Sequence, residues 1–293
     1  MASTATREPP VTTFTFGPAI TPFSENQCEV RTTPLRAFNA NVAILYVILA
    51  VVALVVTWFN SRKIGASPFD SNVYRLVGNY YSDNTVTPPA TVASLVNLTP
   101  HGLSLVLFAA LMLGSLFHFI YALDIRRLYT LLLVDRCNGM RWAQFAIIHT
   151  LLAIVVAQML GTTTFEFLWL VLFAFPLIGI LGYFNDRSYP CSPCLSNVAI
   201  LGTGLIMLAY WVPVITNFTY RFIDSNMAPP VYMWIAMIGL FLFDLMIFVA
   251  PWIQSRQRLS YFVFEMLHTI ALLIISIIVL VCVIWALADQ KNL

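Results

Sequence analysis

Apolar stretches long enough to cross a lipid bilayer recur seven times along the chain. A helix needs about 20 apolar residues to cross ~30 Å of hydrocarbon. Such stretches occur at residues 40–59, 101–123, 142–160, 164–184, 196–216, 230–253 and 261–287. Polar or helix-breaking residues separate them, for example Arg126 and Arg127 after the second stretch. The pattern therefore predicts an all-α membrane protein with seven transmembrane helices.

The composition supports a membrane protein and excludes other classes. Apolar residues make up 60% of the 293 residues and charged residues 10%, with a mean hydropathy of +0.83, whereas soluble proteins carry about 25% charged residues. The net charge of +2, with no run of basic residues, argues against a nucleic-acid partner. Cys191 and Cys194 are closely spaced but lack the two further ligands that zinc needs. We therefore expect the lipid membrane as a partner, with no metal site and no nucleic acid.

Basic residues are distributed unevenly between the segments that connect the predicted helices. Ten arginines, among them Arg126, Arg127 and Arg141, fall on the side that contains the N-terminus, against five basic residues on the other side. Since cytoplasmic segments carry the excess of Lys and Arg, we predict a cytoplasmic N-terminus and a C-terminus outside or in a lumen. The candidate glycosylation sites Asn97 and Asn217 both fall on the predicted outer face.

The chain divides into a head, a membrane domain and a tail. Residues 1–39 are rich in Thr and Pro and show no apolar periodicity, so we expect this cytoplasmic segment to be disordered. Residues 40–287 form the seven-helix transmembrane domain, and residues 288–293 a short outer tail.

Several ionisable and polar side chains lie within the predicted helices. An aspartate at a helix centre costs about 2.5 to 3.5 kcal/mol, so each such residue is a candidate site. Asp244 lies about midway along the sixth helix, either as a proton- or cation-binding group or as a hydrogen-bonded carboxyl group inside the bundle. In the seventh helix Glu265, His268, Thr269 and Ser276 recur at helical spacing and share one face.

Two further histidines and the position of Glu265 extend this candidate polar network. His118 lies in the second predicted helix and His149 in the third. A buried histidine is more often a hydrogen-bonded core residue than a proton carrier. Glu265 lies about one turn from the cytoplasmic end of its helix, where it either points into the bundle or pairs with Arg256 or Arg258.

Six short motifs in a fixed order resemble those of the heliorhodopsins, the inverted seven-helix rhodopsins whose N-terminus is cytoplasmic. They are Leu-Arg-Ala-Phe-Asn at 35–39, Gly-Ser-Leu-Phe-His-Phe at 114–119, Arg-Trp-Ala-Gln-Phe at 141–145, Ala-Gln-Met-Leu-Gly at 157–161, Leu-Gly-Tyr-Phe-Asn-Asp at 181–186 and Leu-Phe-Leu-Phe-Asp at 240–244. The resemblance covers about residues 35–287. It implies a rhodopsin-like bundle and a homodimer, and its orientation is the one that the charges predict independently.

The resemblance also implies a β-hairpin in a long outer loop between the first two helices. Residues 60–99 are long enough for such a loop, and residues 72–86 contain Val, Tyr and Thr around Gly78 and Asn79. This composition is typical of a hairpin. A solvated polar loop is the alternative.

Compared with the heliorhodopsins that it resembles, the chain lacks the amine that binds retinal. Heliorhodopsins hold retinal as a Schiff base on a lysine of the seventh helix. Both lysines of this chain, Lys63 and Lys291, lie outside the predicted helices. Matching Tyr261 to the tyrosine that opens the family's seventh helix places Thr269 at the lysine position. Gln144 takes the place of the family's counterion, a carboxylate that would cost several kcal/mol in the membrane without its cation. We therefore expect no covalently bound retinal and no other cofactor.

These observations favour a membrane protein that acts by interaction, as a receptor, regulator or structural subunit with a protein partner. Its former chromophore cavity would be collapsed or would bind a hydrophobic ligand non-covalently, for example along Trp234, Phe241 and Phe243. One alternative is a proton or ion channel or transporter that uses Asp244, Glu265 and the histidines. Another is a photoreceptor with a non-covalently bound pigment. We expect no enzyme, since no motif for phosphate binding or nucleophilic catalysis occurs.

Overall fold

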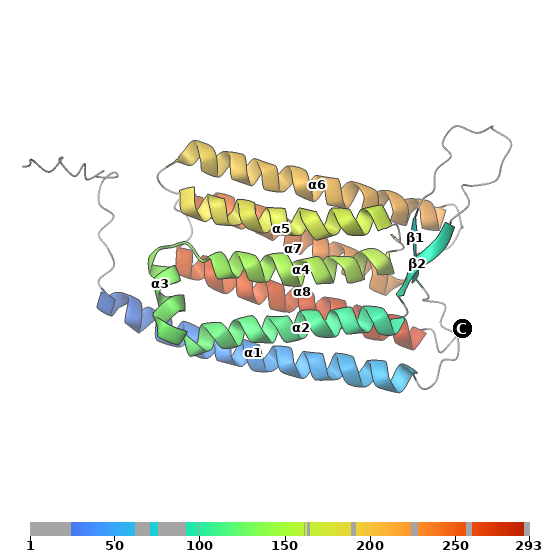
Figure 1. Ribbon diagram of the computed structural model, residues 1–293, viewed down its shortest axis with the longest axis horizontal. Helices are drawn as coiled ribbons and strands as arrows, with labels where there is room; N and C mark the ends of the chain where they lie inside the picture. Colours follow the sequence, from blue (N-terminus) through green and yellow to red (C-terminus); the bar gives the residue numbers. More distant parts are fainter. Residues whose placement is uncertain are drawn as a thin grey trace, which may run out of the picture.

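Long helices that run side by side form the body of the protein (Figure 1). The structure, a computed structural model, describes residues 25–61, 71–75, 92–98, 100–160, 162, 165–188, 192–223, 228–255 and 260–289. The long helices are α1 (Glu25–Ser61), α2 (Pro100–Leu123), α4 (Gly139–Met159), α5 (Phe165–Ser188), α6 (Pro193–Ile223), α7 (Val231–Ser255) and α8 (Tyr261–Asp289). Each contains a segment long and apolar enough to cross a membrane. The prediction of seven transmembrane helices is therefore confirmed.

The prediction that residues 1–39 are disordered is wrong from residue 25 onward. Helix α1 begins at Glu25, and the side chains of Leu35 and Asn39 are buried. Their burial stems from contacts with other helices, which the pattern of this segment alone does not reveal. At the other end of the chain α8 continues to Asp289, two residues into the predicted tail. Residues 1–24 and 290–293 lie outside the described residues.

Helix α4 occupies the centre of the bundle (Figure 1). It packs against α2, α5, α7 and α8, and 72% of its most apolar window is buried, more than in any other span among the described residues. Polar side chains on α4 therefore face protein on almost every side. Because a buried polar group needs a hydrogen-bond partner, this helix is where a polar site is expected.

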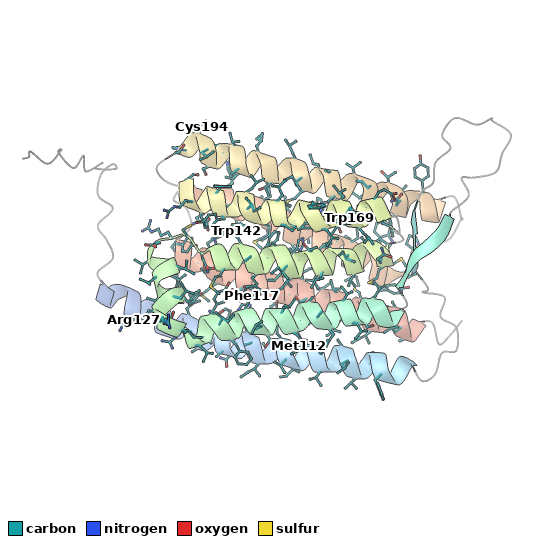
Figure 2. All side chains as sticks on the ribbon, in the orientation of Figure 1. Met112, Phe117, Arg127, Trp142, Trp169 and Cys194 are labelled. Atoms are coloured by element: carbon teal, nitrogen blue, oxygen red, sulfur yellow. The ribbon has the colours of Figure 1, made fainter. Side chains whose placement is uncertain are left out.

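Two glycines allow neighbouring helices to approach closely. A Cβ atom on Gly114 of α2 would lie 2.9 Å from the Tyr46 ring of α1. A Cβ atom on Gly182 of α5 would clash with the Trp142 ring of α4, a side chain that Figure 2 labels between these two helices. Glycine at these positions therefore lets aromatic side chains pack directly against a helix backbone.

Two antiparallel strands lie in the segment between α1 and α2. Strand β1 (Ser71–Arg75) pairs with β2 (Val92–Leu98), with Ser71 opposite Leu98. The second strand lies beyond residues 72–86, so the predicted position of the hairpin is wrong. The cross-strand pairing sets the register and leaves a longer connection than a tight turn at Gly78 and Asn79 would. Both strands lie at one end of the bundle (Figure 1), which we call the β end.

The opposite end of the bundle carries a short helix, α3 (Leu128–Val134), between α2 and α4. A 3-10 helix at Ile125–Arg127 precedes it. We call this end the α3 end. Because successive long helices run in opposite directions, the first residues of α4 and α8 and the last residues of α5 also lie here (Figure 1).

Candidate functional site: a buried polar core

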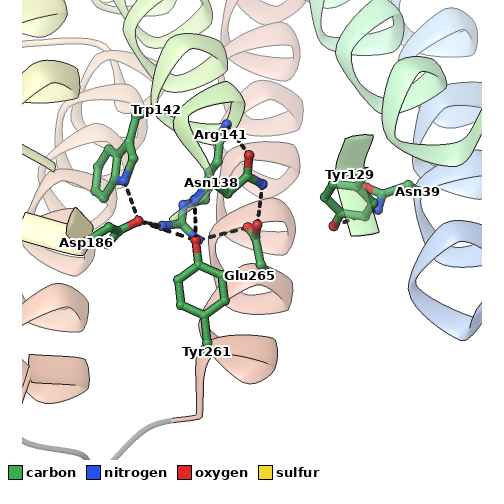
Figure 3. A network of polar contacts seen from close by, with 8 residues as sticks. All are labelled: Asn39, Tyr129, Asn138, Arg141, Trp142, Asp186, Tyr261 and Glu265. Atoms are coloured by element: carbon green, nitrogen blue, oxygen red, sulfur yellow. Dashed lines mark hydrogen bonds and ion pairs between the residues drawn. The ribbon is translucent and has the colours of Figure 1, made fainter. Parts of the chain in front are cut away.

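Arg141 lies at the centre of a buried ion-pair network at the α3 end (Figure 3). Its Nη2 atom is 2.5 Å from Oδ2 of Asp186 on α5, and its Nη1 atom is 3.0 Å from Oε2 of Glu265 on α8. No more than 4% of any of the three side chains is exposed. One cation thus joins two carboxylates from two other helices.

Neutral donors complete the coordination of the two carboxylates. The indole Nε1 of Trp142 donates a hydrogen bond of 2.8 Å to Asp186, and the Tyr261 hydroxyl lies 3.4 Å from the same oxygen. Asn138 donates from its amide to Glu265 and from its backbone N–H to the Tyr261 hydroxyl (Figure 3). A buried carboxylate with several donors is stabilised even without a second cation.

Local structure explains why Asn138 takes part. It is the N-cap of α4, and its side-chain oxygen accepts from the backbone N–H of Arg141 at 3.2 Å. Asparagine is a preferred N-cap residue because this bond satisfies one of the free N–H groups of the first turn. The same side chain therefore starts α4 and bridges it to Glu265 on α8.

The predictions for the charged residues at this end were partly wrong. Arg141 was counted among the arginines of the connecting segments, but it belongs to α4 and is 1% exposed. Its two carboxylate partners explain the burial, because a buried arginine needs compensating charge. Glu265 points into the bundle and pairs with Arg141, whereas Arg256 and Arg258 lie outside the described residues.

A second chain of hydrogen bonds begins one turn further along α4. Nε2 of Gln144 is 2.9 Å from Nε2 of His118 on α2, and Nδ1 of His118 is 2.8 Å from the side-chain oxygen of Asn39 on α1. The amide of Asn39 then donates to the Tyr129 hydroxyl at 3.3 Å. The side-chain oxygen of Asn39 can only accept, so a neutral His118 carries its proton on Nδ1. Its Nε2 atom is then free to accept from the Gln144 amide. This chain can thus form without any charge.

Tyr129, at the end of that chain, lies on α3 outside the membrane spans. Burial, followed by the negative charge of Glu265, raises the pKa of its hydroxyl well above the ordinary value. The hydroxyl therefore keeps its proton at neutral pH and acts as a neutral hydrogen-bonding group.

A third polar group lies in the middle of the bundle. Nε2 of His149 on α4 is 2.7 Å from Oδ1 of Asp244 on α7, and Nε1 of Trp211 on α6 donates to Oδ2 at 2.8 Å. His149 is fully buried and Asp244 is 2% exposed. The predicted candidates His149 and Asp244 therefore lie in direct contact and connect α4 to α7.

Aromatic side chains enclose His149. Its ring stacks on Phe145 with 4.9 Å between centroids, meets Phe175 edge to face at 4.4 Å, and lies 4.9 Å from Phe243. The ring of His268 on α8 meets Phe145 edge to face, with 6.1 Å between centroids. We call these five residues the ring cluster. All are buried, so this part of the bundle is filled by side chains.

The predicted stripe on α8 does not form one site. Glu265 belongs to the Arg141 network, and His268 belongs to the ring cluster, where neither ring nitrogen has a hydrogen-bond partner among the described residues. Ser276 donates to the Leu272 carbonyl at 2.7 Å and lies 3.3 Å from the Tyr46 hydroxyl of α1. Thr269 is half-buried. Side chains on one face of α8 thus lie in three separate environments.

The remaining predicted residues lie on the surface or in the strands. Trp234 and Phe241 are 42% and 45% exposed, on the outside of α7, whereas Phe243 is buried in the ring cluster. The three therefore do not line one groove. Asn97 lies in β2 and Asn217 is exposed near the end of α6, and both elements end at the β end of the bundle (Figure 1).

Sequence reasoning missed several members of these networks. Asn39, Asn138 and Asp186 lie at or next to the ends of the predicted spans, where polar residues are expected to face water. Asn39 and Asp186 each close one of the motifs that resemble the heliorhodopsins, which was a usable signal. No comparable signal pointed to Trp211.

Seven membrane-spanning helices, with α4 at the centre and polar groups directed into the interior, define a rhodopsin-like multi-pass membrane protein. The family model described as Heliorhodopsin matches residues 35–287, which is most of the chain. The chain therefore belongs to the heliorhodopsin family. A comparison with curated proteins gives no match.

Proposed function

We propose that this chain is a retinal-free heliorhodopsin that acts by interaction in the membrane, as a receptor, regulator or structural subunit and not as an enzyme. The observation that carries the proposal is the absence of lysine from all seven spans. At the position where the family resemblance places the lysine, Thr269 offers a hydroxyl group, which cannot form an imine. The residues present therefore do not fit covalent retinal.

The surroundings of Gln144 also support a protein that does not bind retinal covalently. A protonated Schiff base needs a nearby negative charge, because an uncompensated buried cation is costly. Gln144 supplies a neutral amide instead, and that amide is already bonded to His118 at 2.9 Å. The position has become part of a neutral hydrogen-bond chain.

The ring cluster supports a closed interior. Phe145, Phe175 and Phe243 pack around His149 and leave it no exposed surface. We therefore favour a collapsed chromophore cavity over one that holds a non-covalent ligand.

The proposal includes an orientation and an oligomeric state. Arg126, Arg127 and Arg187 are exposed at the α3 end, which supports a cytoplasmic position for that end. The elements that carry the glycosylation sequons of Asn97 and Asn217 end on the opposite side, which agrees with an outer β end. Family membership supports a homodimer.

The experiment is an absorption spectrum of the purified full-length protein after incubation with all-trans retinal. Three proteins are compared: the wild type, the double variant Thr269→Lys with Gln144→Glu, and His268→Lys, which places an amine one residue earlier in the ring cluster. We expect the wild type to remain colourless. Borohydride reduction of each sample then reports any covalent adduct.

The possible outcomes distinguish a persistent cavity, a closed cavity and covalent binding of retinal. A visible band in the double variant alone means that the cavity persists and only its chemistry has been lost. No band in any of the three proteins means that the ring cluster has closed the cavity. A reducible, covalent adduct in the wild type would overturn the proposal and make photoreception the leading function.

A further inference from the structure

Helix α3 crosses the end of the bundle instead of continuing the direction of its neighbours (Figure 1). Sharp backbone turns on both sides produce this course. Asp124, Arg126 and Arg127 before the helix and Arg136 after it have φ values of 45°, 56°, 58° and 52°. Residues with a Cβ atom rarely adopt this left-handed region, so surrounding contacts must hold the turns in place.

The inner side of α3 provides those contacts. The Asp124 carboxylate accepts from the backbone N–H of Thr130 at 3.1 Å and from its hydroxyl at 2.5 Å. Tyr129 is buried and stacks on Tyr121 with 4.7 Å between ring centroids. Arg36 of α1 donates to the Ala122 carbonyl at the end of α2. The helix is thus fixed against the bundle on one side.

The outer side of α3 is apolar and exposed. We call it the α3 face, and it consists of Ile125, Leu128, Leu131 and Val134, which are 58%, 47%, 56% and 41% exposed. The face continues the outward surface of α2, since Leu123, only two residues before Ile125, is 63% exposed. Outward side chains of a transmembrane helix contact lipid, so the continuation places the α3 face at the edge of the same lipid layer.

Basic side chains lie next to the α3 face. Arg126 and Arg127 are exposed between Ile125 and Leu128, and Figure 2 shows Arg127 at the α3 end, beside α1. Leucines on one side and arginines beside them are the combination that holds an amphipathic helix in the headgroup layer. Acidic headgroups complement two adjacent arginines in charge.

We propose that α3 is an interfacial helix whose apolar face inserts among lipid chains while Arg126 and Arg127 bind the headgroups of acidic phospholipids in the same membrane. Charge complementarity and continuity with the lipid-facing side of α2 favour lipid over a second copy of the chain. The inference concerns the membrane-facing surface, so it is independent of the proposal about retinal.

A first experiment measures the position of the α3 face in the full-length protein. Leu131→Cys carries a bimane fluorophore, and Asp135→Cys, at an exposed polar position after the helix, is the matched control. Cys28, Cys191 and Cys194 are changed to serine in both. In nanodiscs of phosphatidylcholine and phosphatidylglycerol, we expect brominated acyl chains to quench the label at 131 and aqueous iodide to quench the label at 135.

Two outcomes would overturn the insertion. Iodide quenching at 131 to the same extent as at 135 would mean that the face lies in water. Quenching at 131 by neither agent would mean that protein covers it, either a second copy or another segment of the chain. Neither result depends on whether the protein binds retinal.

A second experiment tests headgroup binding by native mass spectrometry of retained phosphatidylglycerol. Arg126→Gln is compared with Arg187→Gln, which removes an exposed arginine of α5 at the same end of the bundle. We expect Arg126→Gln to weaken retention about fivefold, with a similar further loss on adding Arg127→Gln, and Arg187→Gln to leave it unchanged. Equal losses in Arg126→Gln and Arg187→Gln, or no loss in either, would overturn the assignment.

Discussion

The network around Arg141 and the hydrogen-bond chain that begins at Gln144 start one turn apart on α4, yet their buried polar groups are satisfied in different ways. Arg141 faces two carboxylates at 2.5 and 3.0 Å, so charge is compensated by charge. Gln144 faces the imidazole of His118 at 2.9 Å, and neutral hydrogen bonds suffice there. In the family, a charge pair with retinal would belong at the second position. Under the proposal of a retinal-free protein no charge is needed at the second position, whereas the partners of Arg141 are carboxylates of the protein itself.

Buried polar groups at the end of the bundle and in its middle contribute to stability in different ways. The Arg141 network joins α4, α5 and α8 at one end, and removal of Arg141 leaves two buried carboxylates without their cation. Further along α4, His149 contacts Asp244, and the aromatic rings around them supply most of the packing. Stability should therefore be more sensitive to the end network than to the middle of the bundle.

The largest effect is expected from Arg141→Met. The variant leaves Asp186 and Glu265 buried without their cation, which we expect to lower the free energy of unfolding by about 3 to 5 kcal/mol. The measurement is thermal unfolding of the purified protein in detergent. The triple variant Arg141→Met, Asp186→Asn, Glu265→Gln serves as the control, and it should recover most of the loss because no charge remains uncompensated. Equal instability of the single and triple variants would show that shape, and not charge balance, makes the network important.

A smaller effect is expected from Asp244→Leu in the middle of the bundle. The change leaves Trp211 Nε1 without its acceptor and removes the carboxylate that contacts His149, at a cost of about 1 to 3 kcal/mol. Asp244→Asn retains an acceptor and should cost less, about 1 kcal/mol or below. Unfolding of both variants is compared with that of Arg141→Met. If Asp244→Leu were as destabilising as Arg141→Met, the distinction between the two regions would fail.

Asp244→Asn also tests the alternative that this protein conducts protons. In vesicles with an imposed pH gradient, we expect no proton flux above that of empty vesicles from either the wild type or the variant. A wild-type flux that Asp244→Asn abolishes would favour a proton path over an interaction role.

The fold was largely predictable because the bilayer imposes a simple constraint on the sequence. Apolar length alone located every span, since each helix in lipid must satisfy its own backbone. The beginning of α1 was missed because residues 25–39 carry no apolar run and are held by contacts such as the burial of Leu35. The strand β2 was missed because pairing between distant segments leaves little trace in a local pattern.

The candidate site was predictable in some of its members but not in its connections. His118, His149, Asp244 and Glu265 could be selected because polar groups are rare inside membrane helices. Gln144 was selected because the family resemblance places it at the counterion position. The residues that these side chains contact could not be predicted, because the rotation of each helix about its axis decides which of its faces packs against a neighbour. The one stripe predicted on α8 contacts different helices at different depths, so Glu265 and Ser276 have no partner in common.

The smallest effect concerns Cys137, which adjoins the Arg141 network and lies just before α4. Burial, reinforced by the negative charge of Asp186, raises the pKa of this thiol. At mildly alkaline pH the exposed Cys194 should therefore react with a maleimide much faster than Cys137, with Cys28 and Cys191 changed to serine. Because the unfolded chain loses the thiol proton at lower pH than the folded chain, Cys137 should slightly lower stability as pH rises through the ordinary thiol pKa and leave it unaffected below. Arg141→Met should speed labelling of Cys137 if the network keeps this end closed, whereas an unchanged rate would show that α3 and its turns protect the thiol without it.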